Sequence, residues 1–440
     1  MKSNPMNNKT QIALLAILLC LLMGCRQEKN GAPLRGAPLQ HFLIGKLTDV
    51  IIYDIYSPPV ASRLYAYTNL AYYEAIRPGS QSISLTDQLN GFDKLNDLPN
   101  PKSIDPSLAG MTAFMTVAKK LIFSKDSMAV VEQLLLKDFE SLDNDVAKNS
   151  IEWGNKVARI VLDRAANDNY KFTRGLPRYS VFNQEEKWQQ TPPDYADATE
   201  PHWSKIMPLL MDSAAQFKPT PPPAYDLRKG SVYYKELMEL YETSKKLSPA
   251  QDTIARYWDD NPFVTQHQGH LAFANKKTTP VGHWMGIIQI LCNTANRNAV
   301  STAKSYAIAA AAIFDGFISC WDEKFRSATP RPVTVIRKHL ESEWNPLLQT
   351  PPFPEYTSGH SVISGAAATV LIHDFGTAFA FRDTTELKYL GMERSFPSIE
   401  AAADEIGISR FYGGIHYMAA IRNGKEQGNK IGQLFNHLKH

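Results

Sequence analysis

The chain has 440 residues, of which 44% are hydrophobic and 21% are charged. This composition is that of an ordinary globular protein, and the length allows one large domain or two ordinary ones with a sizeable core. The formal net charge of +3 indicates neither a nucleic-acid surface nor an acidic tail. Neither a long run of Lys and Arg nor a zinc-type spacing of Cys and His is present, so no nucleic-acid partner is expected.

The N-terminus has the layout of an export signal. Two lysines precede an apolar run from Ile12 to Met23, which is too short for a comfortable membrane span. The run ends in Leu22-Met23-Gly24-Cys25, which resembles a bacterial lipoprotein box, although Met23 is not the usual small residue. We therefore expect residues 1–24 to be a signal peptide and a lipidated Cys25 to attach an exported, periplasmic or cell-surface protein to a membrane. Ordinary cleavage nearby, giving a secreted protein, is the alternative.

Two cysteines, Cys292 and Cys320, lie in the body of the chain beyond the signal, each in an apolar helical context. A disulfide between them is compatible with an oxidising compartment, and two buried thiols are equally compatible with the sequence. Stability is expected to come from the hydrophobic core in either case.

Apolar residues at helical spacing recur along most of the chain, whereas strand patterns are scarce. Helices are predicted over 61–76, 107–123, 127–142, 150–167, 231–247, 249–258, 281–296 and 305–325, after Ser358, and in the final KIGQLFNHL segment. Proline clusters between about 172 and 230 forbid regular helix there. The expected fold class is all-α, with two four-helix bundles and long Pro-rich connections. We expect an N-terminal helical region over 26–230 and a C-terminal bundle over 231–440.

Three polar clusters lie in the C-terminal half, in the segments WDEKFRSATPRP, TSGHS and ISRFYGGIHY. They supply three cations, a hydroxyl, a glycine N–H and two imidazoles, from Lys324 and Arg331, from Ser358, Gly359 and His360, and from Arg410 and His416. Each cluster alone has an ordinary explanation, since a Lys/Arg pair is usually solvated, a serine before a helix is usually a cap, and a single histidine usually belongs to the core.

The combination is typical of a site for a phosphate-like anion. Glycine lets the backbone approach a ligand closely, and a helix N-terminus adds free N–H groups and positive potential. Arginine forks match tetrahedral oxyanions. A neutral imidazole can attack or coordinate the central atom while a second one moves a proton, and His416 and His360 could divide these roles.

The order of these motifs resembles the signature shared by type 2 phosphatidic acid phosphatases and vanadium-dependent haloperoxidases. The pattern begins with Lys324, which is separated by six residues from Arg331-Pro332. It continues with Ser358-Gly359-His360 and ends with Ser409-Arg410, which are separated by five residues from His416. The signature covers roughly residues 321 to 416, and the all-helical body agrees with the fold of that family.

Two departures from the phosphatase pattern favour the haloperoxidases. Thr357 stands where the phosphatases have Pro, and Ala420 stands where they have an Asp that orients the nucleophilic histidine. Trp321 and Phe353 match positions that carry bulky rings in halide-oxidising members, and we predict that they form the halide pocket, although they could be ordinary core aromatics. The bacterial iodoperoxidase branch is the nearest resemblance.

The resemblance implies a vanadate cofactor and oxidation of a halide by hydrogen peroxide to hypohalous acid. His416 would be the vanadium ligand, His360 the acid–base catalyst, and Lys324 the group that polarises the peroxide. The vanadate oxygens would be held by Lys324, Arg331, Ser358, Gly359 and Arg410. Iodide is the expected substrate because it is the easiest halide to oxidise, and bromide is the second candidate.

Two other functions use the same residues. An acid phosphatase would use His416 as the phosphorylated nucleophile. A lipid-anchored phosphate-binding protein would need only the basic cage, which consists of Lys324, Arg331, Ser358, Gly359 and Arg410. Outside the cage, His267, His270 and His283 look like a metal cluster, but no carboxylate at helical spacing completes it, so no metal is expected there. Asp315 is expected to be solvent-exposed or in a salt bridge.

Overall fold

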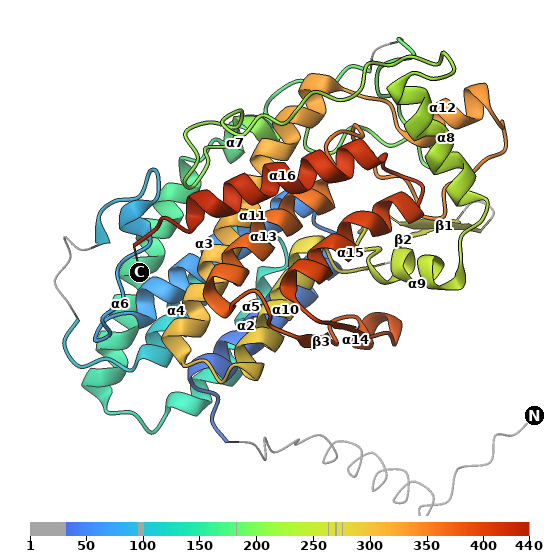
Figure 1. The fold of residues 1–440 in the computed structure, drawn as a ribbon. Helices are drawn as coiled ribbons and strands as arrows, with labels where there is room; N and C mark the ends of the chain where they lie inside the picture. Colours follow the sequence, from blue (N-terminus) through green and yellow to red (C-terminus); the bar gives the residue numbers. More distant parts are fainter. Residues whose placement is uncertain are drawn as a thin grey trace, which may run out of the picture. The chain divides into compact units, whose positions relative to one another are not determined.

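Helices account for nearly all of the regular structure in the described part of the chain (Figure 1). The computed structural model describes residues 32–95, 101–181, 183–262, 264–268, 271–274 and 276–439. The predicted signal peptide and Cys25 lie outside these residues. Among the described residues, one helical stretch, Ala299–His339, is long and apolar enough to cross a membrane, but 94% of its apolar window is buried inside the protein, as in a core helix.

The first bundle consists of α2 (Gly36–Tyr53), α3 (Pro58–Ile76), α4 (Pro106–Leu121) and α6 (Asn144–Ala166), with α5 (Lys125–Leu136) packed beside α4. Side-chain caps and a first-turn proline start two of these helices: Ser57 accepts from the N–H of Val60 before α3, and Asp105 accepts from the N–H of Leu108 before α4. All residues of α3 are buried, because it also contacts the second bundle.

The second bundle consists of α11 (Ala299–Ser327), α13 (Gly359–Phe375), α15 (Ile399–Tyr412) and α16 (Met418–Phe435), and α10 (Pro280–Thr294) packs against α11 and α13. The long helix α11 contacts both α2 and α3 and so joins the two bundles into one compact unit, Arg35–His440. The all-α fold class with helical bundles is therefore confirmed. The predicted domain boundary between residues 230 and 231 stays a prediction.

The remaining elements are short. They are the helices α7 (Tyr170–Arg174), α8 (Val232–Ser244), α9 (Pro249–Tyr257), α12 (Pro332–His339) and α14 (Leu387–Leu390), with single 3-10 turns at Thr86–Gln88, Lys137–Phe139 and Trp203–Lys205. Two antiparallel strand pairs complete the inventory of the described ranges: β1 (Thr265–Gln268) with β2 (Leu271–Ala274), and β3 (Phe381–Asp383) with β4 (Arg394–Phe396).

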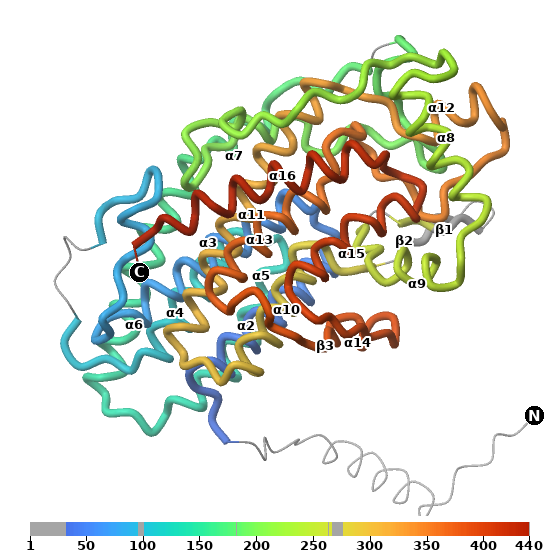
Figure 2. The backbone as a smooth tube through the Cα atoms, viewed as in Figure 1, coloured from blue at the N-terminus to red at the C-terminus, as the bar shows by residue number. Residues whose placement is uncertain are grey.

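The predicted Pro-rich connection carries little regular structure between α7 and α8, and Figure 2 traces it in green. It is held against the second bundle by backbone hydrogen bonds. The N–H of Trp188 donates to the carbonyl of Ala328 at 2.7 Å, and the N–H of Thr199 donates to the carbonyl of Pro352 at 2.9 Å. The connection thus lies against the segments that flank the polar motifs.

Five helices are not predicted from the sequence: α2, α7, α12, α14 and α15. Helix α15 contacts α8, α9, α13 and α16, so apolar residues point in several directions and the helical period is blurred. Helix α5 also ends earlier than the predicted 127–142, because the chain tightens into the 3-10 turn Lys137–Phe139 after Leu136.

Helices α13 and α16 approach one another very closely, and α16 lies beside α13 in Figure 1. Three glycines of α16, spaced four residues apart, face α13. A Cβ atom at Gly428 would lie 2.0 Å from the carbonyl oxygen of Val362, and one at Gly424 would lie 3.1 Å from the carbonyl oxygen of Ser358. The glycine face of α16 therefore fixes the position of the first turn of α13, where the Ser-Gly-His motif lies.

Candidate active site

Two buried cations hold the loop that leads to α13. Lys324, in the last turn of α11, donates from Nζ to the carbonyl oxygens of Pro354 at 2.9 Å, Glu355 at 3.0 Å and Thr357 at 2.5 Å. Arg331, which precedes α12, donates from Nε to the carbonyl of Phe353 at 2.8 Å. Because three bonds use all the donors of an ammonium group, Lys324 must exchange one of them before it can bind an anion.

Both predicted arginines keep N–H groups free inside the protein. Arg331 donates from Nη1 to the carbonyl of Ile415 at 2.9 Å, and Arg410 donates from Nη1 to the carbonyl of Trp258 at 2.7 Å. Nη2 of Arg331 and both Nε and Nη2 of Arg410 are buried without a hydrogen-bond partner among the described residues. Buried charged donors are costly when left unpaired, so this arrangement calls for an anion.

Burial acts on the charge of these groups. It lowers the pKa of Lys324 to about 7 and the pKa of Arg331 to about 9, and it also lowers the pKa of Arg410. A bound anion would restore the ordinary preference of all three for the charged form.

His416 is held in one orientation by a carboxylate. Its Nδ1 lies 2.9 Å from Oε1 of Glu355, which also accepts from the N–H of Tyr417 at 3.0 Å. Burial, followed by the charge of Arg331, lowers the pKa of His416 well below its ordinary range. A neutral ring that donates from Nδ1 presents the lone pair of Nε2, which lies 3.2 Å from Nη1 of Arg331.

Glu355 is the functional residue that the sequence analysis missed. Ala420 offers no carboxylate where the phosphatases have their orienting Asp, but here the carboxylate comes from the loop before α13 rather than from α16. Burial raises the pKa of Glu355 to about 7. A lone Glu among prolines, two residues before the Thr-Ser-Gly-His segment, carries no sequence pattern that could have assigned it this contact.

The Ser-Gly-His motif opens α13, and its serine caps that helix. Oγ of Ser358 accepts from the N–H of Ser361 at 3.4 Å, which is a long capping bond. The next residue, Gly359, exposes its backbone to the space beside Trp321, since an added Cβ would lie 3.6 Å from that ring. His360 is partly buried, and its Nε2 has no partner in the described part of the chain. Burial lowers the pKa of His360 well below its ordinary range.

A small cavity brings the motifs together, with about 30 Å³ of room for the centre of a water-sized molecule. It is lined by Gly359, His360, Arg410 and His416, by Trp321 and Phe353, and by Pro58, Pro280, Phe317, Pro351 and Ile415. Lys324, Arg331 and Ser358 stand behind this lining rather than in it. The first bundle contributes Pro58, a wall residue that no motif in the sequence marks.

The two rings that are predicted to form the halide pocket lie next to one another in the cavity wall. The ring centroids of Trp321 and Phe353 are 5.0 Å apart and tilted by 50°. Nε1 of Trp321 donates to the carbonyl of Thr199 at 3.1 Å, so the Pro-rich connection fixes this ring. Both rings are almost fully buried, and both also line the cavity.

Three other residues singled out from the sequence have structural roles. Asp315 is fully buried and accepts from the N–H groups of Leu209, Leu210 and Met211, so the expectation of an exposed or salt-bridged Asp315 is wrong. Cys292 and Cys320 are buried free thiols, which decides the open question of a disulfide.

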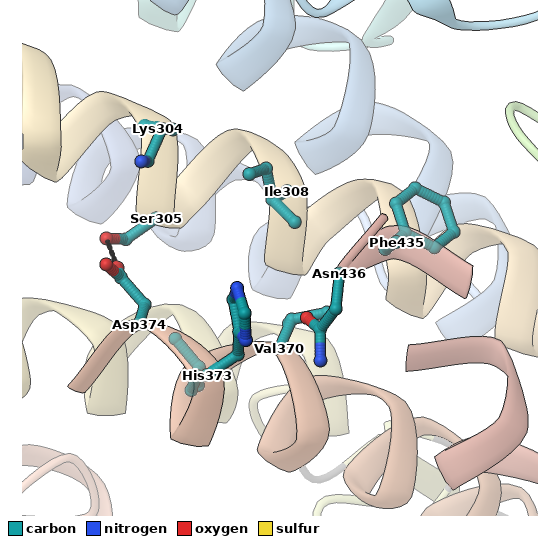
Figure 3. A pocket seen from close by; sticks show the side chains of 9 residues that line it. Lys304, Ser305, Ile308, Val370, His373, Asp374, Phe435 and Asn436 are labelled. Carbon is teal, nitrogen blue, oxygen red and sulfur yellow. Dashed lines mark hydrogen bonds between the residues drawn. The ribbon is translucent and has the colours of Figure 1, made fainter. Parts of the chain in front are cut away.

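A separate cavity of about 170 Å³ lies between α11, α13 and the end of α16 (Figure 3). Its lining includes Lys304, His373 and Asn436, and Oγ of Ser305 donates there to Oδ2 of Asp374 at 2.5 Å. None of the predicted site residues lines this cavity.

The cage fits a tetrahedral oxyanion such as vanadate. Arg410, with two N–H groups that lack a partner among the described residues, lines one small cavity together with a neutral, oriented His416 and the glycine at the start of α13, and Arg331 stands behind them. The cage combines cationic donors for oxygen atoms with one imidazole nitrogen that can serve as a ligand for the central atom.

Comparisons with known proteins agree with this geometry. Residues 304–440 match the family described as VCPO second helical-bundle domain. The chain is similar to the structure described as the first bacterial vanadium-dependent iodoperoxidase, with 44% identity and a TM-score of 0.86 over 94% of this chain and 99% of that one. A comparison with curated proteins gives no match.

Two further structures share the fold at low identity. They are the holo-type and apo-type bacterial vanadium-dependent chloroperoxidases, with 17% and 16% identity and a TM-score of 0.66 for each. The alignments cover 86% and 87% of this chain and 91% and 94% of theirs. With its near-complete match to the iodoperoxidase and its intact motifs, the chain belongs to the enzyme family of vanadium-dependent haloperoxidases.

Proposed function

We propose that this haloperoxidase holds vanadate in the cage and oxidises iodide with hydrogen peroxide to hypoiodous acid. The observation that carries the proposal is the set of polar nitrogen atoms on Arg331, Arg410 and His360 that lack a partner among the described residues, beside a neutral, oriented His416. Iodide is the proposed halide because it is the easiest to oxidise and because the relative at 44% identity is an iodoperoxidase. Bromide is the second substrate to test.

The residues of the cage would divide the work of binding. When bound, vanadate supplies a Lewis-acidic centre that makes hydrogen peroxide electrophilic. His416 would provide Nε2 as the ligand, while Glu355 keeps Nδ1 protonated and the ring fixed. The free N–H groups of Arg331 and Arg410 would bind oxygen atoms, with Ser358, the N–H of Gly359 and the charge of Lys324 behind them.

His360 and the two aromatic rings would serve the reaction itself. The overall change joins one iodide, one hydrogen peroxide and one proton into hypoiodous acid and water. His360 lines the cavity, and its Nε2, which lacks a partner among the described groups, would hold and transfer that proton. Trp321 and Phe353 would exclude water from the place where iodide meets the activated oxygen.

An assay of triiodide formation tests the proposal. The mature protein is stripped in phosphate-free chelating buffer and assayed with iodide and hydrogen peroxide, with and without orthovanadate. Activity should appear only with vanadate and should vanish in His416→Ala, while the exposed His437→Ala variant retains it. A parent protein that stays inactive with bound vanadate would overturn the proposal.

The phosphatase alternative is supported by one observation, the contact between Glu355 and His416, because it supplies the orienting carboxylate that Ala420 lacks. The same stripped protein is therefore offered a phosphomonoester. Vanadate-inhibited hydrolysis without any iodide oxidation would favour a phosphatase with His416 as its nucleophile.

We also propose export of the protein and lipid attachment through Cys25. The support is the sequence of the first 25 residues, with its apolar run and lipoprotein-like box. Mass spectrometry of the mature N-terminus in a bacterial host tests this point. A diacylated Cys25 is expected, whereas an unmodified mature end or a retained Met1 would contradict lipidation.

A further inference from the structure

A second polar cluster lies behind Arg410, outside the cage. It contains Asp260, which follows α9, His283 on α10, Asp383 at the end of β3, and Glu386, which precedes α14. All four residues are buried, with exposed fractions of 3%, 2%, 0% and 3% in that order. Three carboxylates around one imidazole in the protein interior need compensation by a cation or by protons.

His283 is clamped between two of these carboxylates. Nε2 lies 2.9 Å from Oδ2 of Asp383, whose other oxygen accepts from the N–H of Thr385 at 3.0 Å and from its hydroxyl at 2.7 Å. Nδ1 lies 3.0 Å and 3.1 Å from the two oxygens of Asp260. With Nε2 donating to Asp383, Nδ1 can present a lone pair, which is the arrangement of a metal-binding histidine with an orienting carboxylate.

Glu386 provides an independent observation. Its Oε1 is buried and lacks a hydrogen-bond partner within the described ranges, and it lies 3.8 Å from Nδ1 of His283. One ligand atom from each of Asp260, His283 and Glu386 lies within 4.8 Å of the others. Ligand atoms bound at about 2.0–2.2 Å from one ion are separated by up to roughly twice that distance, so a small closing movement suffices.

We propose that Asp260, His283 and Glu386 bind a divalent transition-metal ion such as Zn²⁺ or Mn²⁺, with Asp383 positioning the His283 ring. One imidazole nitrogen beside carboxylate oxygens suits these ions better than Ca²⁺ or Mg²⁺, which prefer oxygen ligands alone. Two carboxylate ligands neutralise the charge of the ion. The histidine was considered as a metal ligand in the sequence only with His267 and His270, whose side chains lie outside the described part.

The proposed ion would stabilise one wall of the vanadate cage. The ring of Trp258 stacks on His283, with centroids 4.5 Å apart and an angle of 29°. The carbonyl of the same Trp258 accepts from Nη1 of Arg410 at 2.7 Å. An ion that ties the segments after α9, in α10 and before α14 would therefore hold the tryptophan that positions Arg410.

Direct metal measurement tests the site without vanadate or halide, so its result is independent of the proposed peroxidase activity. The chelator-stripped mature protein is titrated calorimetrically with Zn²⁺ and Mn²⁺, and bound metal is counted by mass spectrometry after desalting. One equivalent should bind, and the Glu386→Gln and Asp260→Asn variants should lose it. The matched variant Glu393→Gln, on the same excursion between β3 and α15, should bind as the parent does.

Asp383→Asn should weaken binding by roughly 10- to 100-fold rather than abolish it, because it removes only the orienting contact. X-ray absorption at the zinc edge of the parent protein needs no variant, and should show one imidazole with oxygen neighbours. The absence of a bound equivalent, a shell with several imidazoles or with sulfur, or full binding by folded Glu386→Gln would each overturn the proposal.

Discussion

At the scale of single residues, the contact between Glu355 and His416 decides how the cage works. The motif order in the sequence identifies both histidines, both arginines and the Ser-Gly pair, because each has a fixed spacing. It does not identify Glu355, because the position of this side chain depends on a loop whose backbone carbonyls accept hydrogen bonds from Lys324 and Arg331. Contacts that depend on the course of a loop cannot be inferred from spacing alone.

The variant Glu355→Gln tests this contact. It keeps the size of the side chain but removes the negative charge that holds Nδ1 of His416 protonated, so vanadate affinity and vanadate-dependent iodide oxidation should both fall by roughly 10- to 100-fold. Equilibrium dialysis against vanadate measures the affinity. Glu74→Gln, at an equally buried glutamate of α3, should leave both quantities unchanged. Parental vanadate affinity in folded Glu355→Gln would refute the positioning role.

At the scale of elements, the glycine face of α16 fixes the position of the N-terminal turn of α13. The glycines at 424, 428 and 432 can be read from the sequence as a four-residue repeat, but their meaning requires the partner helix. A sequence with few strand patterns and regular apolar spacing predicts helices and bundles. Which helices pack closely depends on side-chain volume at the contact, and a helix buried on several sides, such as α15, loses its periodic pattern.

Gly428→Ala should destabilise the protein by about 3 kcal/mol, because the new Cβ would lie 2.0 Å from a backbone oxygen of α13 and one of the helices must move. Denaturant unfolding measures the loss. The control Gly45→Ala, on the exposed side of α2 with no atom within 4 Å of the new Cβ, should instead stabilise by up to about 1 kcal/mol. Equal effects of the two substitutions would disprove the close-packing argument.

At the scale of the whole molecule, the two bundles meet through α11. His41 of α2 is buried there, and its Nδ1 lies 2.9 Å from the hydroxyl of Tyr306 on α11. The same junction places Pro58 at the start of α3 in the wall of the cage. The sequence predicts α3 and α11 as separate helices, but not that residues from the first bundle complete a site whose motifs all lie in the second.

This junction should make stability depend on pH. Burial lowers the pKa of His41 from 6.5 to about 4. As the pH falls, the imidazole is therefore protonated near pH 6.5 in the unfolded chain but only near pH 4 in the folded protein. Stability is therefore greatest above pH 6.5 and falls as the pH decreases, with a loss at this site of about 2 kcal/mol between roughly pH 7.5 and 5.

Urea unfolding at several pH values measures this dependence. His41→Gln should remove this part of the slope, whereas Tyr306→Phe should keep it, since the imidazole stays buried. An unchanged slope in His41→Gln would show that other groups cause the acid sensitivity.

The burial of the two cysteines has a consequence for the working life of the enzyme. The proposed product, hypoiodous acid, attacks thiolates and electron-rich rings, and the enzyme meets it first. Cys292 and Cys320 are shielded from solvent, and burial raises the pKa of both thiols, that of Cys292 to about 11, so they stay in the less reactive form. Hypoiodous acid made by the enzyme should therefore react with exposed phenols such as Tyr53 and Tyr195, where iodination leaves the core intact.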